Sequence, residues 1–148
     1  VAISIYISIR FDRKYAFLAL FALFHDLLIV FGIFSWLGII LSVEVNSLFA
    51  VSLLTIAGYS VNDTVVIFDR IRENLKSSKQ DYNETIQLSV NESFRRTTFT
   101  SITTLIPLLT LILFGSYSLF WFSLSLSLGI IVGSYSSILF APSFLIKD

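Results

Sequence analysis

Four long apolar segments constrain the fold of this 148-residue chain more than any other feature. They lie at residues 15–40, 48–68, 94–114 and 119–144. Each provides the ~20 helical residues needed to cross a hydrocarbon core of about 30 Å. Backbone groups in lipid must be hydrogen-bonded within their own segment, and these runs lack the alternation of barrel strands. The sequence therefore predicts an all-α, polytopic transmembrane helix bundle.

Composition supports this class and excludes several others. Only 14% of the residues are charged, whereas soluble proteins carry about a quarter. The net charge is zero, so we expect no nucleic-acid partner. The chain has no cysteine and a single histidine, His25, which excludes thiolate and multi-histidine metal sites. We expect neither a metal nor an organic cofactor.

The apolar residues 1–9, "VAISIYISI", are too few to cross a bilayer as a helix. No basic region precedes them and no cleavage signal follows them, as a signal peptide would require. We therefore expect the end of one helix followed by four full spans, all within a piece of a longer protein.

The basic residues predict the orientation of the spans. None lies in the connections 42–47 or 115–118, so all of them fall on one side of the predicted topology. The positive-inside rule makes that side cytoplasmic. The ten residues are Arg10, Arg13, Lys14, Arg70, Arg72, Lys76, Lys79, Arg95, Arg96 and Lys147.

The polar stretch 69–93 is therefore predicted to be a cytoplasmic loop. Its apolar residues recur at four-residue steps, as in Ile71 and Leu75, and again in Ile86 and Val90. This spacing predicts two short helices lying on the membrane surface and broken near "KSSK". The alternative is a solvated connector.

Asp63 is an ionisable residue inside the second span, where a charge costs about 2.5–3.5 kcal/mol at the membrane centre. Such residues usually face a bundle interior or a water-filled path. Gly58 beside it would permit close approach by a neighbouring helix. A purely structural carboxylate is the alternative. A predicted polar stripe continues from it along the span through Ser52, Thr55, Tyr59 and Asn62.

The third span carries a second predicted polar stripe, and Pro107 predicts a kink near Thr103. Arg96 could extend to the membrane interface, but the spans are antiparallel neighbours, which favours pairing with Asp63. The stripe comprises Ser93, Arg96, Thr97, Thr100, Thr103 and Thr104.

Two further groups of residues stand out in the remaining spans. His25 and Asp26 lie near the middle of the first span, where a structural pair and a proton-handling pair are equally open. The fourth span has small residues at four-residue steps, which predicts tight helix packing. These are Ser125, Gly129, Gly133, Ser136 and Ser137.

Four motifs together resemble the membrane region of the SecD/SecF family of protein-export subunits, and its SecF members in particular. They are "AGYSVNDTVVIFDRIREN", "ESFRRTTFTSITTL", "FALFHDLLIVFGIF" and "SLGIIVGSYSSILFAPSFL", and they extend over essentially the whole chain. The resemblance implies membership of the RND superfamily of proton-driven transporters. It also implies six helices in the complete protein, with a large extracytoplasmic domain between the first two.

The resemblance implies a role for two residues. The proton-pathway carboxylate of the family matches Asp63, and its functional arginine matches Arg96, whereas the residues alone leave Arg95 and Arg96 open. Possible supporting residues are Asn62, Tyr59, Thr97, His25 and Asp26.

The resemblance also implies a cellular setting. With SecD, such a protein uses the proton-motive force to draw a translocating polypeptide out of the SecYEG channel. The expected location is the lipid bilayer of the inner (plasma) membrane, or a thylakoid membrane if the source is cyanobacterial or plastid.

Three other functions are alternatives to protein export. One is an RND-superfamily exporter of lipid or small molecules, which would share the fold and the proton site. Another is an intramembrane aspartyl protease using Asp26 and Asp63, but the contexts "HD" and "ND" differ from the Tyr-Asp and Gly-x-Gly-Asp of such enzymes. The last is a structural membrane scaffold, in which Asp63 could be replaced freely. We expect the chain not to be an enzyme.

Overall fold

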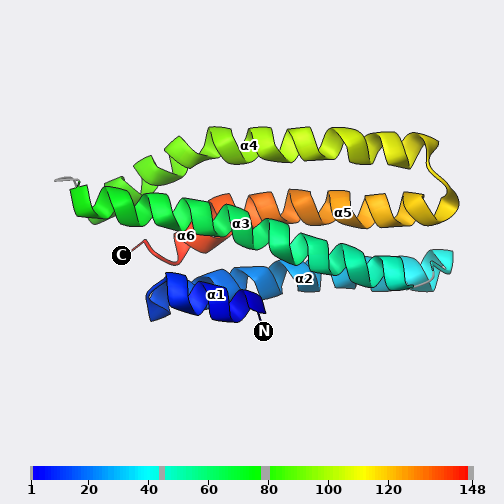
Figure 1. Ribbon diagram of the computed structural model, residues 1–148, viewed down its shortest axis with the longest axis horizontal. Helices are drawn as coiled ribbons and strands as arrows, with labels where there is room; N and C mark the ends of the chain where they lie inside the picture. Colours follow the sequence, from blue (N-terminus) through cyan, green and yellow to red (C-terminus); the bar gives the residue numbers. More distant parts are fainter. Residues whose placement is uncertain (1, 44–45, 78–80, 147–148) are drawn as a thin grey trace.

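A computed structural model describes residues 2–43, 46–77 and 81–146 of the chain, and this part is built of helices without a strand. Figure 1 shows them side by side in a bundle, which confirms the predicted all-α class. The helices are α1 (Ala2–Arg10), α2 (Arg13–Leu41), α3 (Ser47–Ser77), α4 (Tyr82–Phe114), α5 (Tyr117–Tyr135), the π-helical turn η1 (Ser136–Phe140) and α6 (Ala141–Ser143).

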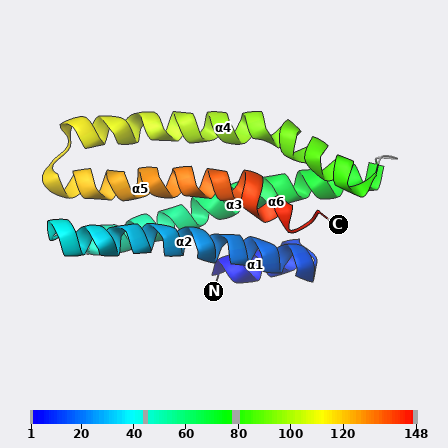
Figure 2. The ribbon, with the colours of Figure 1, turned by 180° about the vertical axis from the view of Figure 1, so that it is seen from behind.

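Among the described residues, four helical stretches are long and apolar enough to cross a membrane. They are α2, α3, α4 and the continuous run of α5, η1 and α6. The chain is thus a multi-pass membrane protein, and α1 packs beside α2 at one end of the bundle, as Figure 2 shows from behind.

The prediction of two surface helices in residues 69–93 is wrong. Residues 69–77 continue α3, and residues 82–93 form the start of α4. At 1.5 Å per residue the two helices are roughly 46 and 50 Å long, so both extend well beyond a 30 Å hydrocarbon core. The segment has neither glycine nor proline to end a helix, and it is rich in good helix formers.

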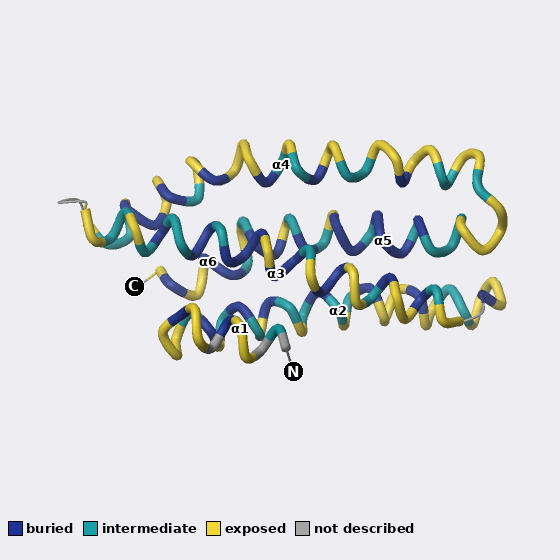
Figure 3. Tube along the Cα trace, in the orientation of Figure 1, coloured by how far each residue is buried: buried dark blue, intermediate teal, exposed yellow. Residues whose placement is uncertain are grey.

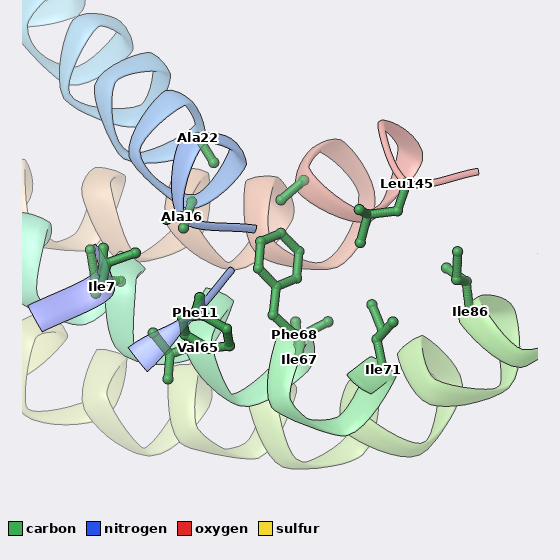
Figure 4. Close-up of a cluster of buried hydrophobic side chains, with 13 residues drawn as sticks. Ile7, Phe11, Ala16, Ala22, Val65, Ile67, Phe68, Ile71, Ile86 and Leu145 are labelled. Atoms are coloured by element: carbon green, nitrogen blue, oxygen red, sulfur yellow. The ribbon is translucent and has the colours of Figure 1, made fainter. Parts of the chain in front are cut away.

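The apolar residues of this segment pack inward instead of lying on a membrane surface. Ile71 and Ile86 are fully buried in a core cluster that also contains Phe68. Figure 4 shows this cluster. Ile7 of α1 and Leu145, which follows α6, both belong to it. Burial against α1 and Leu145 therefore fixes the polar extensions of α3 and α4.

A second apolar cluster fills the opposite half of the bundle. Its buried residues come from α2 to α5, and it includes Val30, Ile56 and Ile130. Buried polar residues lie between members of the two clusters on several helices, for example Asp26 on α2 and Ser60 on α3, and Asp63 follows within one turn of Ser60. The bundle thus has an internal polar layer between two apolar layers, and that layer contains the candidate site.

Helix α4 is the most exposed of these four spans, and Figure 3 shows it as yellow along its outer side. It packs against α3 and α5, and its other side presents apolar residues such as Phe99 and Ile106. The helix continues through Pro107 without interruption, and the kink expected near Thr103 stays a prediction. The visible bend of α4 lies in its green first part in Figures 1 and 2.

The last span changes its winding at η1. The N–H of Ala141 bonds the carbonyl of Ser136, five residues back, which is the π-helical pattern. Pro142 follows at once, and its ring cannot donate a backbone hydrogen bond. Such π turns occur often at functional sites, and this one contributes Ser136 and Ser137 to the polar layer.

Candidate functional site

Asp63 lies in the polar layer on the inward face of α3. The residue is only 4% exposed, and its Oδ2 atom has no hydrogen-bond partner in the described chain. A buried carboxylate oxygen without a partner is expensive, because it loses its hydration and gains nothing in return. Such a group therefore calls for a proton, a cation or water.

Arg96 of α4 is the cation whose charge acts on Asp63. No ion pair within 4.0 Å joins the two among the described residues, so the predicted direct pairing is not formed in this conformation. Arg96 is exposed and lines a polar cleft between α3 and α4. Val66 also lines this cleft, and Asp63 lies one turn deeper on the same face of α3.

The two neighbouring arginines are placed differently. The guanidinium of Arg95 lies 5.7 Å from the ring centre of Phe99, one turn along the outer face of α4. Such a contact is a cation–π arrangement at the bundle surface. Of the two arginines, Arg96 is therefore the one that shares a cleft with α3.

The mouth of the cleft is lined by charged residues that join α3 to α4. Arg70 donates to Glu92 across the helices over 2.7 Å and to Glu73 on its own helix over 2.9 Å. Asn74 donates to Glu92 over 3.0 Å. The hydrogen bonds from Asn74 and Arg70 hold the pKa of Glu92 below its usual value, because they favour the charged carboxylate.

Tyr59 connects three helices within the polar layer. Its hydroxyl lies 3.1 Å from Oγ of Ser101 on α4, which in turn lies 2.5 Å from Oγ of Ser134 on α5. Thr97 is buried one turn before Ser101, whose hydroxyl donates to the Thr97 carbonyl. Two of the five predicted supporting residues, Tyr59 and Thr97, thus face the bundle interior.

The predicted stripe on α3 is divided between two faces of the helix. Ser52, like Asp63, is buried, whereas Thr55 and Asn62 are exposed. Gly58 is exposed too, and nothing lies within 4 Å of a Cβ built on it. No helix of the described chain approaches Gly58, so the close contact expected there is not made within this chain.

On α4, the polar residues that are buried lie on a different face of the helix from part of the predicted stripe. Thr103 is exposed and Arg96 lies at the cleft, while Ser101, which we did not predict, is buried at the centre of the network. The sequence did contain the signal, because hydroxyl residues recur at exact four-residue steps. The buried series is Thr85, Ser89, Ser93, Thr97 and Ser101.

His25 and Asp26 form a separate group on the far side of α3. Asp26 is fully buried, and its Oδ2 accepts a hydrogen bond of 2.5 Å from Oγ of Ser60. Its Oδ1 lies 3.1 Å from Nδ1 of His25. The His25 side chain is 29% exposed, and its ring stacks on Phe140 of η1 with centroids 4.3 Å apart.

Gly129 and Gly133 lie where α5 crosses α3. A Cβ built on Gly129 would be 2.3 Å from Ile56, and one on Gly133 would be 3.2 Å from Cβ of Ser60. The missing side chains allow α5 to approach α3 closely at the level of the polar layer. Within the described residues, no group of three His, Cys, Asp or Glu side chains could hold a metal ion.

Comparison with protein families matches residues 1–147 to "Protein export membrane protein SecD/SecF, C-terminal". The chain belongs to the SecD/SecF family. Individual relatives carry a narrower name. The chain is 60% identical over 144 residues to a "Protein translocase subunit SecF" of Prochlorococcus marinus, and 49% identical over 144 residues to one of Synechocystis. These matches cover 97% of this chain but only 45% and 46% of the two relatives.

The fold also matches a solved structure, "Crystal structure of SecDF in Super-membrane-facing form". The TM-score is 0.88 at 40% sequence identity, and the match covers 96% of this chain and 19% of that chain. The chain thus spans less than half the length of the relatives above and about a fifth of the SecDF chain.

Proposed function

We propose that this chain is the membrane part of a protein-export subunit that uses the proton-motive force, with Asp63 as its proton carrier. In this proposal it acts with SecD beside the SecYEG channel and promotes movement of the translocating polypeptide. Its location is the inner (plasma) membrane, or a thylakoid membrane in a cyanobacterial or plastid source.

The observation that carries the proposal is the state of Asp63. Its carboxyl is buried in the polar layer, one oxygen has no hydrogen-bond partner, and the cation that acts on it lies on another helix. A purely structural carboxylate would be expected to have both oxygens bonded. The names of the relatives supply the export setting.

The geometry suggests how proton binding is coupled to movement. When Asp63 is charged, its attraction to Arg96 draws α3 and α4 together, and a proton on Asp63 removes that attraction. The cleft at Val66 and Arg96 gives water a route from the cytoplasmic side to within one turn of the carboxyl. A proton that crosses the full potential supplies ~2.3 kcal/mol per 100 mV, which drives the cycle.

The test is Asp63→Asn in the full-length protein, reconstituted with its partner subunit in vesicles. Asparagine keeps the shape and the hydrogen-bonding capacity of the side chain but cannot titrate. We expect the complex to assemble normally, since a costly charge is removed from the membrane. Proton flux and proton-driven export should fall to the level of vesicles without the protein.

Asp12→Asn is the matched control, because Asp12 is exposed at the start of α2 and its side chain makes no capping hydrogen bond. It should leave flux and export unchanged. Normal proton-driven export by the Asp63→Asn complex would refute the mechanism. Loss of assembly in that variant would instead indicate a structural carboxylate. Proton flux without polypeptide export in the unchanged protein would favour an exporter of lipid or small molecules.

A further inference from the structure

Asp26 is a second carboxyl in the polar layer, and the role proposed for Asp63 does not use it. It faces three elements of the bundle at once. Ser60 of α3 donates to Oδ2, His25 of α2 contacts Oδ1, and the hydroxyl of Ser136 at the start of η1 lies beside the carboxyl. The Ser136 hydroxyl is fully buried and lacks a hydrogen bond of good geometry.

The need to avoid a net charge decides how many protons His25 and Asp26 hold together. The described chain places no lysine or arginine against Asp26, and an isolated charge so deeply buried would be prohibitively costly. One proton solves this problem, whether it lies on Oδ1 of Asp26 or on Nδ1 of His25. Either placement gives the 3.1 Å contact between these atoms and leaves the pair with no net charge.

The groups around the pair allow this proton to be exchanged rather than trapped. His25 is the titratable group in contact with Asp26, while the groups facing it from α3 and η1 are hydroxyls and the Phe140 ring. Asp63 lies three residues beyond Ser60 on α3, so the helix that carries Asp63 also carries the hydroxyl that bonds Asp26. The His25 ring is partly exposed among apolar side chains such as Phe24 and Leu28, so the water that exchanges this proton has to enter through the polar layer.

The position of the pair also couples it to the helices that would move. Ser137 of η1 lies 2.8 Å from the hydroxyl of Thr64 and donates to the carbonyl of Ser60 over 3.4 Å. Asp26, Ser60 and the π turn thus form one connected group between α2, α3 and the last span. A change in the charge of the pair would alter the contacts of three elements together.

We propose that His25 and Asp26 form a second proton-binding site, which takes up and releases one proton in each transport cycle. This inference rests on the proposed function, since it assigns the pair to the same proton-driven cycle. In the step itself, water enters the polar layer, the O–H bond at Oδ1 or the N–H bond at Nδ1 breaks, and the proton passes to that water, which hydrates the charge left on the pair. The reverse step restores the neutral pair.

Infrared difference spectra of the full-length complex with its partner, recorded as the pH is changed, test the binding. We expect the wild type to show a carboxylic-acid C=O band that is lost in Asp26→Asn and kept in Asp63→Asn. Ser60→Ala is the structural control. It removes a hydrogen bond to Oδ2 but no titratable group, so the band should shift in frequency and remain. An Asp26→Asn spectrum identical to that of the wild type would overturn the proposal.

Proton flux per exported polypeptide in vesicles tests the exchange. We expect this ratio to fall in Asp26→Asn, and an unchanged ratio would overturn the proposal even if the infrared band is lost. Should Asp26→Asn fail to assemble, His25→Gln provides the answer. It should shift the pH midpoint of the band, because glutamine cannot share the proton, and an unshifted midpoint would overturn the proposal. Failure of the Asp63 mechanism is recognised separately, by normal export in Asp63→Asn.

Discussion

The buried carboxylates of Asp26 and Asp63 differ in their hydrogen bonding. Both oxygens of Asp26 have a close partner, whereas Oδ2 of Asp63 has none in the described chain. The difference follows from their surroundings. Asp26 faces the hydroxyl-rich π turn, while Asp63 lies behind a cleft that opens to solvent at Arg96. A carboxylate next to a cleft can bind water, which makes it suitable for exchanging protons.

The two arginines of α4 provide a residue-level prediction. Arg96→Ala should abolish most proton-driven export, and Arg96→Lys should impair it only in part, because lysine keeps the charge but loses the planar fork of donors. Arg95→Ala is the matched control, since Arg95 lies over Phe99 and not at the cleft. Export from vesicles is the measurement. Equal losses from Arg95→Ala and Arg96→Ala would contradict this assignment.

Glu92 provides a prediction about pH. Its pKa is lowered in the folded protein by Asn74 and Arg70, so its contribution to stability is present above its ordinary pKa. That contribution is lost as the pH falls through the lowered value. We expect the protection of amide hydrogens at the start of α4, measured against their intrinsic exchange rate at each pH, to fall on acidification in the wild type, and to be low already at neutral pH in Glu92→Gln.

Glu84→Gln serves as the control for this experiment. Glu84 lies in the first turn of the same helix and is exposed, and it has no ion pair with α3 in the described chain. Its exchange should retain the pH dependence of the wild type. The same pH dependence in Glu92→Gln would show that the cross-helix pair does not hold α3 and α4 together.

The crossing of α5 over α3 is decided by the small residues of α5. A methyl group at Gly129 would lie 2.3 Å from the Ile56 side chain, which is itself buried, so either that side chain or one of the helices must shift. Gly129→Ala should therefore destabilise the bundle by about 1–3 kcal/mol, as overpacking generally does. The melting temperature of the purified protein in detergent measures the effect.

Two companion variants make this test specific. Gly58→Ala should leave the melting temperature nearly unchanged, because nothing lies within 4 Å of the added atom. Removing the obstacle with Ile56→Ala should recover part of the loss in the Gly129→Ala protein, although it leaves space elsewhere. Equal effects of Gly58→Ala and Gly129→Ala would show that the crossing is not tightly packed.

Element boundaries were harder to predict than the elements themselves. The four spans were recognisable from apolar length, but the polar extensions of α3 and α4 were assigned to the membrane surface. Amphipathic spacing alone does not say what covers the apolar side. Here α1 and the end of the last span supply the cover, through residues such as Ile7 and Leu145. Contacts between segments so distant in sequence could not be predicted from local spacing.

The orientation of the whole molecule remains a prediction, and it can be tested directly. Ser47 and Ser77 are exposed residues at opposite ends of α3. The chain contains no cysteine, so single cysteines at these positions label without background from it. In intact cells a membrane-impermeant reagent should label position 47 and spare position 77. Labelling of both positions from one side would overturn the topology.

The candidate site was only partly predictable. Asp63 and Arg96 could be selected because charges in apolar spans are costly, and the family motifs pointed to the same pair. Their surroundings could not be predicted. Ser101 was missed although it follows the same four-residue series as Thr97, because a hydroxyl can equally bond its own helix backbone and face lipid. Only its contacts with Tyr59 and Ser134 distinguish it.

The sequence by itself determined how many spans cross the membrane, how long they are and which charges lie within them. These properties depend on the thickness and the low polarity of the bilayer, which act on each segment separately. The tertiary structure alone decided which polar groups meet. Asp26 faces Ser60, and Asn62 faces outward, because side-chain packing sets how far each helix is rotated and shifted against its neighbours.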